Sequence, residues 1–70
     1  MSNKHVNRLR VLRAERNISQ MDAADAVAMS ANRFWRIENG YTEPTDDEKE
    51  ALARFFGVRV RDIFTSGRAA

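Results

Sequence analysis

Residues 19–40 of the chain, SQMDAADAVAMSANRFWRIENG, hold two short helical patterns separated by a break at Met29-Ser30. Serine is a favoured N-cap, and Ser19 is followed three positions later by Asp22, which suits the positive end of a helix dipole. Most of the following residues are alanine, so another helix can cross this one at close range, with Ala24 at the crossing. The pattern predicts a short, alanine-rich helix that runs from Ser19 to the break.

A second helix begins after Ser30, which can serve as its N-cap. We expect it to cover residues 31–39 and to stop at Gly40, because glycine commonly follows a helix end. Phe34 and Ile37 lie three positions apart and share the face turned toward the core. Two short helices joined by so short a break match a helix-turn-helix motif. The opposite face of the second helix displays Ala31, Asn32, Trp35 and Arg36, with Arg33 at its flank.

Three further helical segments are expected around this motif. The first covers Lys4 to Arg16 and ends at Asn17, a residue type that tolerates the left-handed conformation. Another opens with the capping box Thr45-Asp46-Asp47-Glu48 and continues to about Phe56, before Gly57. A short helix over residues 60–64 follows. The apolar stripe of the helix before Gly57 is Leu52, Phe55 and Phe56.

The sequence thus predicts an all-α fold, a compact five-helix bundle. The chain has 70 residues, of which 43% are hydrophobic and 31% charged, a composition typical of a globular protein. We expect a single domain over residues 1–70, with an ordered core from about 4 to 65 and a frayed tail at 66–70.

Composition also limits the possible functions. The chain has no cysteine and one histidine. We therefore expect no thiolate chemistry, no metal site and no catalytic triad. An enzyme is not expected, and no cofactor is implied. We interpret the acidic residues 46–48 as helix-start chemistry rather than as a metal site. No apolar run approaches the ~20 residues of a membrane span, and the N-terminus has no signal-peptide core, which favours a cytoplasmic protein.

Basic charge is concentrated in the first part of the chain. The net charge is +2, but residues 1–40 contain seven basic and four acidic residues, whereas residues 41–70 contain five basic and six acidic ones. An arginine-rich half is typical of proteins that bind a polyanion such as nucleic acid, although a solvated surface gives the same pattern.

Several of these residues together closely resemble the phage repressor and Cro-like helix-turn-helix family. The resemblance extends from about Leu9 to Phe64. It rests on Ser19-Gln20, Ala24, Val27, Met29-Ser30, Phe34, Arg36-Ile37-Glu38-Asn39-Gly40 and Phe56-Gly57-Val58. It implies a lambda-repressor-like domain whose third helix enters the DNA major groove, and a protein that acts as a sequence-specific transcriptional regulator of double-stranded DNA.

The exposed face of that third helix supplies the expected base contacts. Arg36 is the best candidate for a bidentate contact to guanine, and Asn32 can pair likewise with adenine. The methyl group of Ala31 suits a thymine methyl. Trp35 can pack on thymine methyls, on sugars or at a dimer seam, or fold back over the protein's own surface. Arg33 flanks this set.

Phosphate contacts are expected from two places. The resemblance implies that Gln20 contacts a phosphate and braces the third helix. The loop after that helix supplies Asn39, Gly40, Tyr41 and Thr42, and weaker candidates are Arg10 and Arg16.

The resemblance further implies an internal ion pair between Arg13 and Glu38, with a DNA contact by Arg13 as the alternative. Three positions depart from the family pattern. Ala28 stands where the family usually has the turn glycine, so a positive φ there would cost about 1 kcal/mol. Ala23 replaces the usual leucine, and Arg59 replaces the usual serine or threonine cap.

A module of this size makes few contacts, so we expect a homodimer on a palindromic operator, with half-sites ~34 Å apart. No membrane or small-molecule partner is inferred. The expected dimer surface is Val58, Val60, Ile63 and Phe64, with Tyr41 as an addition. Two alternatives are also compatible with this pattern, namely a DNA-binding antitoxin of a toxin–antitoxin pair and a protein-interaction adaptor with the same fold.

Overall fold

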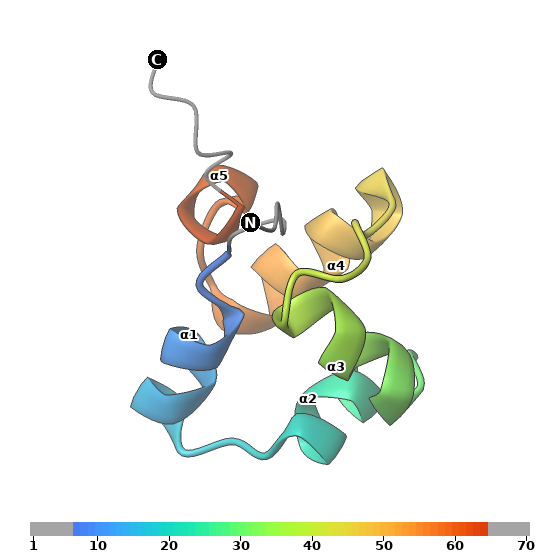
Figure 1. Cartoon of the computed structure of the whole chain (residues 1–70). Helices are drawn as coiled ribbons and strands as arrows, with labels where there is room; N and C mark the ends of the chain where they lie inside the picture. Colours follow the sequence, from blue (N-terminus) through green and yellow to red (C-terminus); the bar gives the residue numbers. More distant parts are fainter. Residues whose placement is uncertain (1–6, 65–70) are drawn as a thin grey trace.

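The computed structural model describes residues 7–64, which form five helices around a common core (Figure 1). The helices are α1 (Leu9–Arg16), α2 (Gln20–Ala26), α3 (Ala31–Glu38), α4 (Asp46–Phe56) and α5 (Val60–Ile63). No strand occurs among the described residues. The all-α, five-helix architecture expected from the sequence is confirmed. None of the helices in this range has the length and apolar composition needed to cross a bilayer.

The first helix starts later than expected. Its predicted beginning at Lys4 lies outside the described residues, and Asn7 and Arg8 are not helical, so α1 begins at Leu9. The Asn7 side chain explains this boundary, because its Oδ1 accepts a hydrogen bond from the backbone N–H of Leu9 at 3.0 Å. Its Nδ2 donates to the carbonyl of Ile37 at 2.8 Å. One amide therefore accepts the first N–H of α1 and ties this end of the helix to α3.

The turn between α2 and α3 is longer than the sequence predicted. Helix α2 ends at Ala26, and Val27 and Ala28, which were expected to be helical, lie in the turn. Ala28 has a φ of 57°, the left-handed conformation in which the family pattern has glycine. The N–H of Met29 then returns to the carbonyl of Ala24 at 2.9 Å. The chain reverses at Ala28 because its positive φ breaks the helical path.

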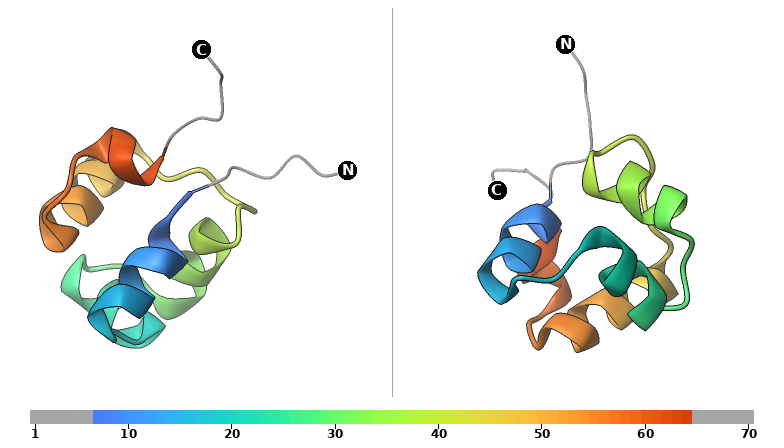
Figure 2. Two further views of the ribbon diagram at one scale, coloured as in Figure 1. Left: turned by 90° about the vertical axis from the view of Figure 1, so that its left-hand side faces the viewer. Right: turned by 90° about the horizontal axis from the view of Figure 1, so that it is seen from below.

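Helices α2 and α3 pack side by side, whereas α4 and α5 form a second pair (Figure 2). Ala23 and Ala24 are almost completely buried, so small side chains allow the close approach. Phe34 is fully buried in the same core. The core comprises Leu9, Leu12, Ala23, Ala24, Phe34, Ile37, Leu52, Ala53, Phe56 and Ile63.

The capping box of α4 is present as predicted, with reciprocal bonds between Thr45 and Glu48, and Gly57 ends the helix at a φ of 71°. The expected helix over 60–64 is one residue shorter, because Phe64 lies past the end of α5. Arg59 provides no side-chain cap for α5, but its backbone N–H donates a hydrogen bond to Asp62 Oδ2 at 3.0 Å.

Two apolar side chains lie outside the core against expectation. The buried stripe of α4 is Leu52, Ala53 and Phe56, and Phe55 lies about 110° around the helix from the centre of that stripe. The predicted membership of Phe55 in the stripe is therefore wrong, and the residue is 38% exposed. Methionine is ordinarily a flexible filler of core space, but Met21 is 67% exposed, whereas Met29 packs against the core.

We expect Ala28→Gly to stabilise the protein. The left-handed conformation destabilises the folded state by about 1–2 kcal/mol for a non-glycine residue. Glycine removes this strain, but its greater freedom in the unfolded chain reduces the gain in stability by about 0.4–1 kcal/mol. The free energy of unfolding, measured by urea denaturation, should rise by up to about 1.6 kcal/mol. Asn17→Gly is the control, because Asn17 has a φ of 56° but asparagine tolerates it better. A destabilised Ala28→Gly variant would contradict the strain argument.

Candidate nucleic-acid interface

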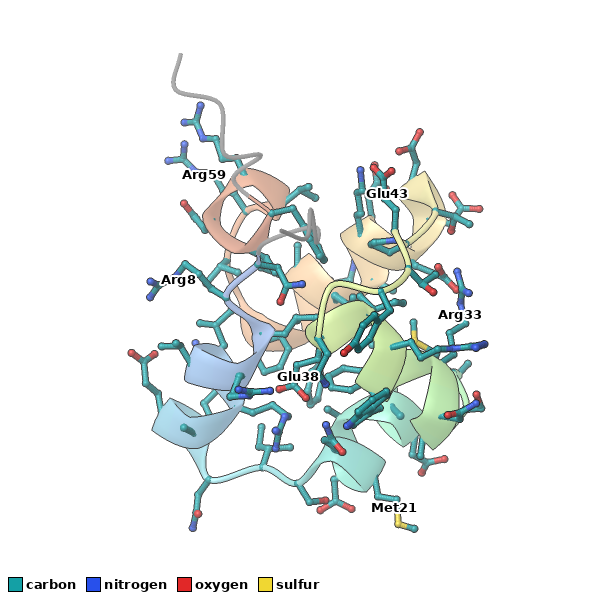
Figure 3. All side chains as sticks on the ribbon, viewed as in Figure 1. Arg8, Met21, Arg33, Glu38, Glu43 and Arg59 are labelled. Carbon is teal, nitrogen blue, oxygen red and sulfur yellow. The ribbon has the colours of Figure 1, made fainter. Side chains whose placement is uncertain are left out.

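A buried charge cluster fixes α3 against α1 and α2. The Glu38 side chain is 0% exposed, and its Oε2 accepts from Nε and Nη2 of Arg13 at 3.0 and 2.9 Å. Its Oε1 accepts a short hydrogen bond from Gln20 Nε2. Figure 3 shows Glu38 near the middle of the molecule, on the side of α3 that faces α1. Side chains from three helices thus meet at one carboxylate.

Arg13 belongs to the interior. Its remaining nitrogen, Nη1, donates to the carbonyl of Ile18 at 2.9 Å, and its side chain is 18% exposed. All three guanidinium nitrogens are therefore used within the domain. The structure thus has the internal pair that the resemblance implied, and it gives no support to the alternative of a DNA contact by Arg13.

The outer face of α3 is open to solvent. Phe34 and Ile37 are fully buried, whereas Ala31, Asn32, Trp35 and Arg36 are exposed on the other side. Within residues 7–64, neither Asn32 nor Arg36 makes a side-chain hydrogen bond or ion pair. Both side chains can therefore meet a ligand without breaking a hydrogen bond or ion pair to another described residue.

Trp35 packs against the protein's own surface at the loop after α3. Its ring stacks on that of Tyr41, with centroids 5.7 Å apart and an interplanar angle of 24°. The two residues are 44% and 58% exposed, so the pair forms an aromatic surface at the end of α3. The sequence identified each residue separately, but not their contact, because the loop conformation after α3 decides it.

A chain of hydrogen bonds brings Arg10 to the same end of α3. Asn39 Nδ2 donates to the carbonyl of Trp35 at 2.9 Å, and Asn39 Oδ1 accepts from Arg10 Nη2 at 2.8 Å. Thr42 is half-buried in the following loop. Of the expected phosphate contacts, Arg10 and Asn39 are therefore joined to each other, Tyr41 is joined to Trp35, and Gln20 lies against Glu38.

Arg16, a weaker phosphate candidate, serves the fold instead. Its Nη2 donates to the carbonyl of Phe56 at 2.9 Å, and its guanidinium lies 5.5 Å from the centroid of the Phe56 ring. These contacts join α1 to the end of α4, so the interpretation of Arg16 as a DNA contact is not supported.

Arg33 forms a bidentate ion pair with Glu48 of α4. The Nε–Oε2 distance is 2.8 Å and the Nη2–Oε1 distance is 2.7 Å. The hydrogen bonds from Arg33, together with the N–H of Thr45, outweigh partial burial and lower the pKa of Glu48 to about 2. The same pair raises the pKa of Arg33. The sequence assigned Glu48 only to the capping box and missed this pair.

One residue of the expected dimer surface is buried within the chain itself. Ile63 is 0% exposed, so its inclusion in that surface is wrong, because its side chain completes the core beneath α5. Val58, Val60 and Phe64 are half-buried and pack against the core. Sequence reasoning did not identify Phe55 as part of the exposed apolar surface.

The model of a helix-turn-helix domain matches residues 6–63. An uncharacterised HTH-type transcriptional regulator of Methanocaldococcus jannaschii is 36% identical over 58 residues, which is 83% of this chain and 88% of that protein. RstR, the transcriptional repressor of the cryptic phage CTXphi in Vibrio cholerae, is 30% identical over 57 residues, covering 81% of this chain and 51% of the repressor.

Two further proteins give similar results. An HTH-type transcriptional regulator of Deinococcus deserti is 35% identical over 60 residues, which is 86% of this chain and 46% of that protein. The chain thus spans about half the length of this protein and of RstR. The crystal structure of the clp gene regulator ClgR from Corynebacterium glutamicum superimposes with a TM-score of 0.72 over 77% of this chain and 57% of that chain, at 24% identity. That likeness shows a shared fold.

We expect Arg13→Ala to lower the free energy of unfolding by about 3–5 kcal/mol, because it leaves the buried Glu38 carboxylate without its cation. Urea denaturation followed by circular dichroism at pH 7 measures the change. Glu15→Ala is the control, since it removes an exposed pair with Arg16 at 3.6 Å, and such pairs contribute about 0–1 kcal/mol. Equal losses in the two variants would show that the Glu38 cluster adds no special stability.

Acid should weaken the contribution of Glu48. Its pKa lies at about 2 in the folded protein against 4.5 for the free side chain, so this contribution is complete above about pH 4.5 and is lost toward pH 2. Thermal melting between pH 7 and pH 2 should show wild type more stable than Glu48→Gln at neutral pH, with the difference disappearing in acid. A difference that stays constant with pH would disprove this linkage.

Proposed function

The chain belongs to the helix-turn-helix domain family, and from this membership we propose that it is a sequence-specific regulator of transcription that binds double-stranded DNA. The exposed face of α3 supports this proposal most directly. On it, Asn32 and Arg36 make no side-chain hydrogen bond or ion pair within residues 7–64. The Glu38 cluster holds the helix that carries them in place. The role is non-enzymatic, as the sequence predicted.

In this proposal α3 lies in the major groove. Arg36 donates two hydrogen bonds to guanine O6 and N7, and Asn32 forms a bidentate pair with adenine. Ala31 and the exposed edge of Trp35 provide apolar contact to thymine methyls or sugars. Arg33 is left out of this set because Glu48 occupies its guanidinium.

The end of α3 and the loop that follows it provide phosphate contacts. Arg10 and Asn39 lie together there, and Tyr41 and Thr42 follow in the chain. Gln20 has two roles in this proposal. Its amide donates a hydrogen bond to Glu38 inside the domain. It also contacts a phosphate, because it stands at the start of α2, beside the helix that is proposed to enter the groove. Such contacts position a protein on the duplex without selecting its sequence.

We further propose that two copies bind a palindromic operator, with half-sites ~34 Å apart. The surface that fits this role contains the half-buried Val58, Val60 and Phe64, with Phe55 as the most exposed apolar residue of α4. RstR is a transcriptional repressor, and repression by operator occupancy is the mode proposed for this chain. Sedimentation of the protein with and without operator DNA tests the two-to-one complex.

Selection from a random double-stranded DNA library at near-physiological salt tests the function. We expect an enriched palindrome. Arg36→Ala should then lose preference at one base position of each half-site, at a cost of about 1–3 kcal/mol in specific binding, because a bidentate base contact is removed.

Two variants serve as comparisons for Arg36→Ala. Arg54→Ala removes an exposed arginine of α4 and should leave the preferred sequence unchanged. Gln20→Ala should weaken binding to all sequences and keep the base preference. Equal losses of Arg36→Ala on operator and random DNA would show that Arg36 contacts only phosphate. The absence of any enriched sequence would reject the regulator and favour the protein-interaction adaptor.

A further inference from the structure

Arg33 lies where a DNA contact would be expected. It is about 60° around α3 from Arg36, at one residue per 100° of turn, and so borders the proposed DNA-binding face. An arginine side chain at this position is long enough to reach from that border to a groove or its phosphates. Its guanidinium instead points to α4, where it meets Glu48.

The Glu48 carboxylate is held in place independently of Arg33. Its Oε1 accepts the backbone N–H of Thr45 at 2.8 Å, and the N–H of Glu48 donates to Thr45 Oγ1 at 3.1 Å. These are the two bonds of the capping box of α4. The acceptor is therefore already oriented before Arg33 arrives, and only one flexible side chain must be ordered.

This arrangement makes the pair stronger than an ordinary surface ion pair. Exposed pairs contribute little because two mobile side chains must be fixed. Here the geometry is bidentate, the arginine is 34% exposed and the glutamate 24% exposed. Fork-shaped arginine–carboxylate pairs are among the strong charge-assisted hydrogen bonds. A DNA phosphate competing for Arg33 must break both bonds and compete with a carboxylate that is already fixed.

We propose that Glu48 acts as an intramolecular substitute for phosphate, which withholds Arg33 from DNA and limits the number of cationic contacts at the border of the recognition surface. The inference rests on the proposed DNA binding. It makes Glu48 a determinant of DNA affinity although Glu48 contacts no DNA. It also replaces the expected base contact of Arg33 with a positioning role that joins α3 to α4.

Glu48→Gln is the variant that separates these roles. Glutamine can keep the capping box, because it also serves at this helix position, but it carries no charge to hold Arg33. Released Arg33 would add one phosphate contact. On a random-sequence duplex of 20 base pairs, the slope of log Kobs against log salt should become steeper by about 0.9. At about 0.1 M salt this corresponds to binding up to about eight-fold tighter.

Three further variants complete the test, each checked for folding by circular dichroism. Arg33→Ala alone should leave the wild-type salt slope unchanged. Arg33→Ala combined with Glu48→Gln should return the slope to the wild-type value. Asp47→Asn, in the same turn of α4, removes an equal charge from a residue other than the Arg33 partner Glu48 and should not change the slope.

Other results would overturn the inference. A shallower slope for Arg33→Ala alone would mean that Arg33 already contacts phosphate in the wild type. Equal tightening by Glu48→Gln with and without Arg33, or by Asp47→Asn, would mean that acidic residues simply repel DNA. If wild-type protein binds no duplex at any salt concentration, the proposed function fails and the inference fails with it. Wild-type binding with an unchanged Glu48→Gln slope rejects the inference alone.

Discussion

The buried carboxylate of Glu38 governs the arrangement of the first three helices. A buried charge is destabilising unless its hydrogen-bonding capacity is satisfied by suitable partners. Arg13 of α1 and Gln20 of α2 provide them, and no buried side-chain nitrogen or oxygen in the described residues lacks a partner. A helix arrangement that moved Arg13 or Gln20 out of reach of Glu38 would leave the buried carboxylate without that partner. The direction in which the outer face of α3 points is therefore set from inside the domain.

Most arginines of the basic N-terminal half are engaged within the protein. Arg13 and Arg16 connect α1 to other segments, and Arg33 connects α3 to α4. Arg10 is bonded to Asn39 at the surface. Net charge therefore overstates the cations free to meet a polyanion. Arg36, exposed on the outer face of α3, differs from these residues, and its position carries more functional information than the charge total.

The predictable parts of the fold are those determined by local chemistry. The N-caps of α2, α3 and α4 and the left-handed Gly57 follow from a few neighbouring residues, so most helix boundaries agreed with the sequence. The resemblance also implied the pair of Arg13 and Glu38. The Asn7 bridge and the pair of Arg33 with Glu48 were missed, because each joins residues distant in sequence. The burial of Ile63 and the exposure of Phe55 likewise depend on how α4 and α5 turn relative to the core.

The stacked pair at the end of α3 has a spectroscopic consequence. Trp35 and Tyr41 are the single tryptophan and the single tyrosine of the chain, and their rings are close enough for efficient transfer of excitation from tyrosine to tryptophan. The aromatic residues of the core are phenylalanines, which emit weakly. Intrinsic fluorescence of this protein therefore reports on one exposed surface patch rather than on the interior. Its emission would follow local rearrangement at the end of α3 even where the helical core stays intact.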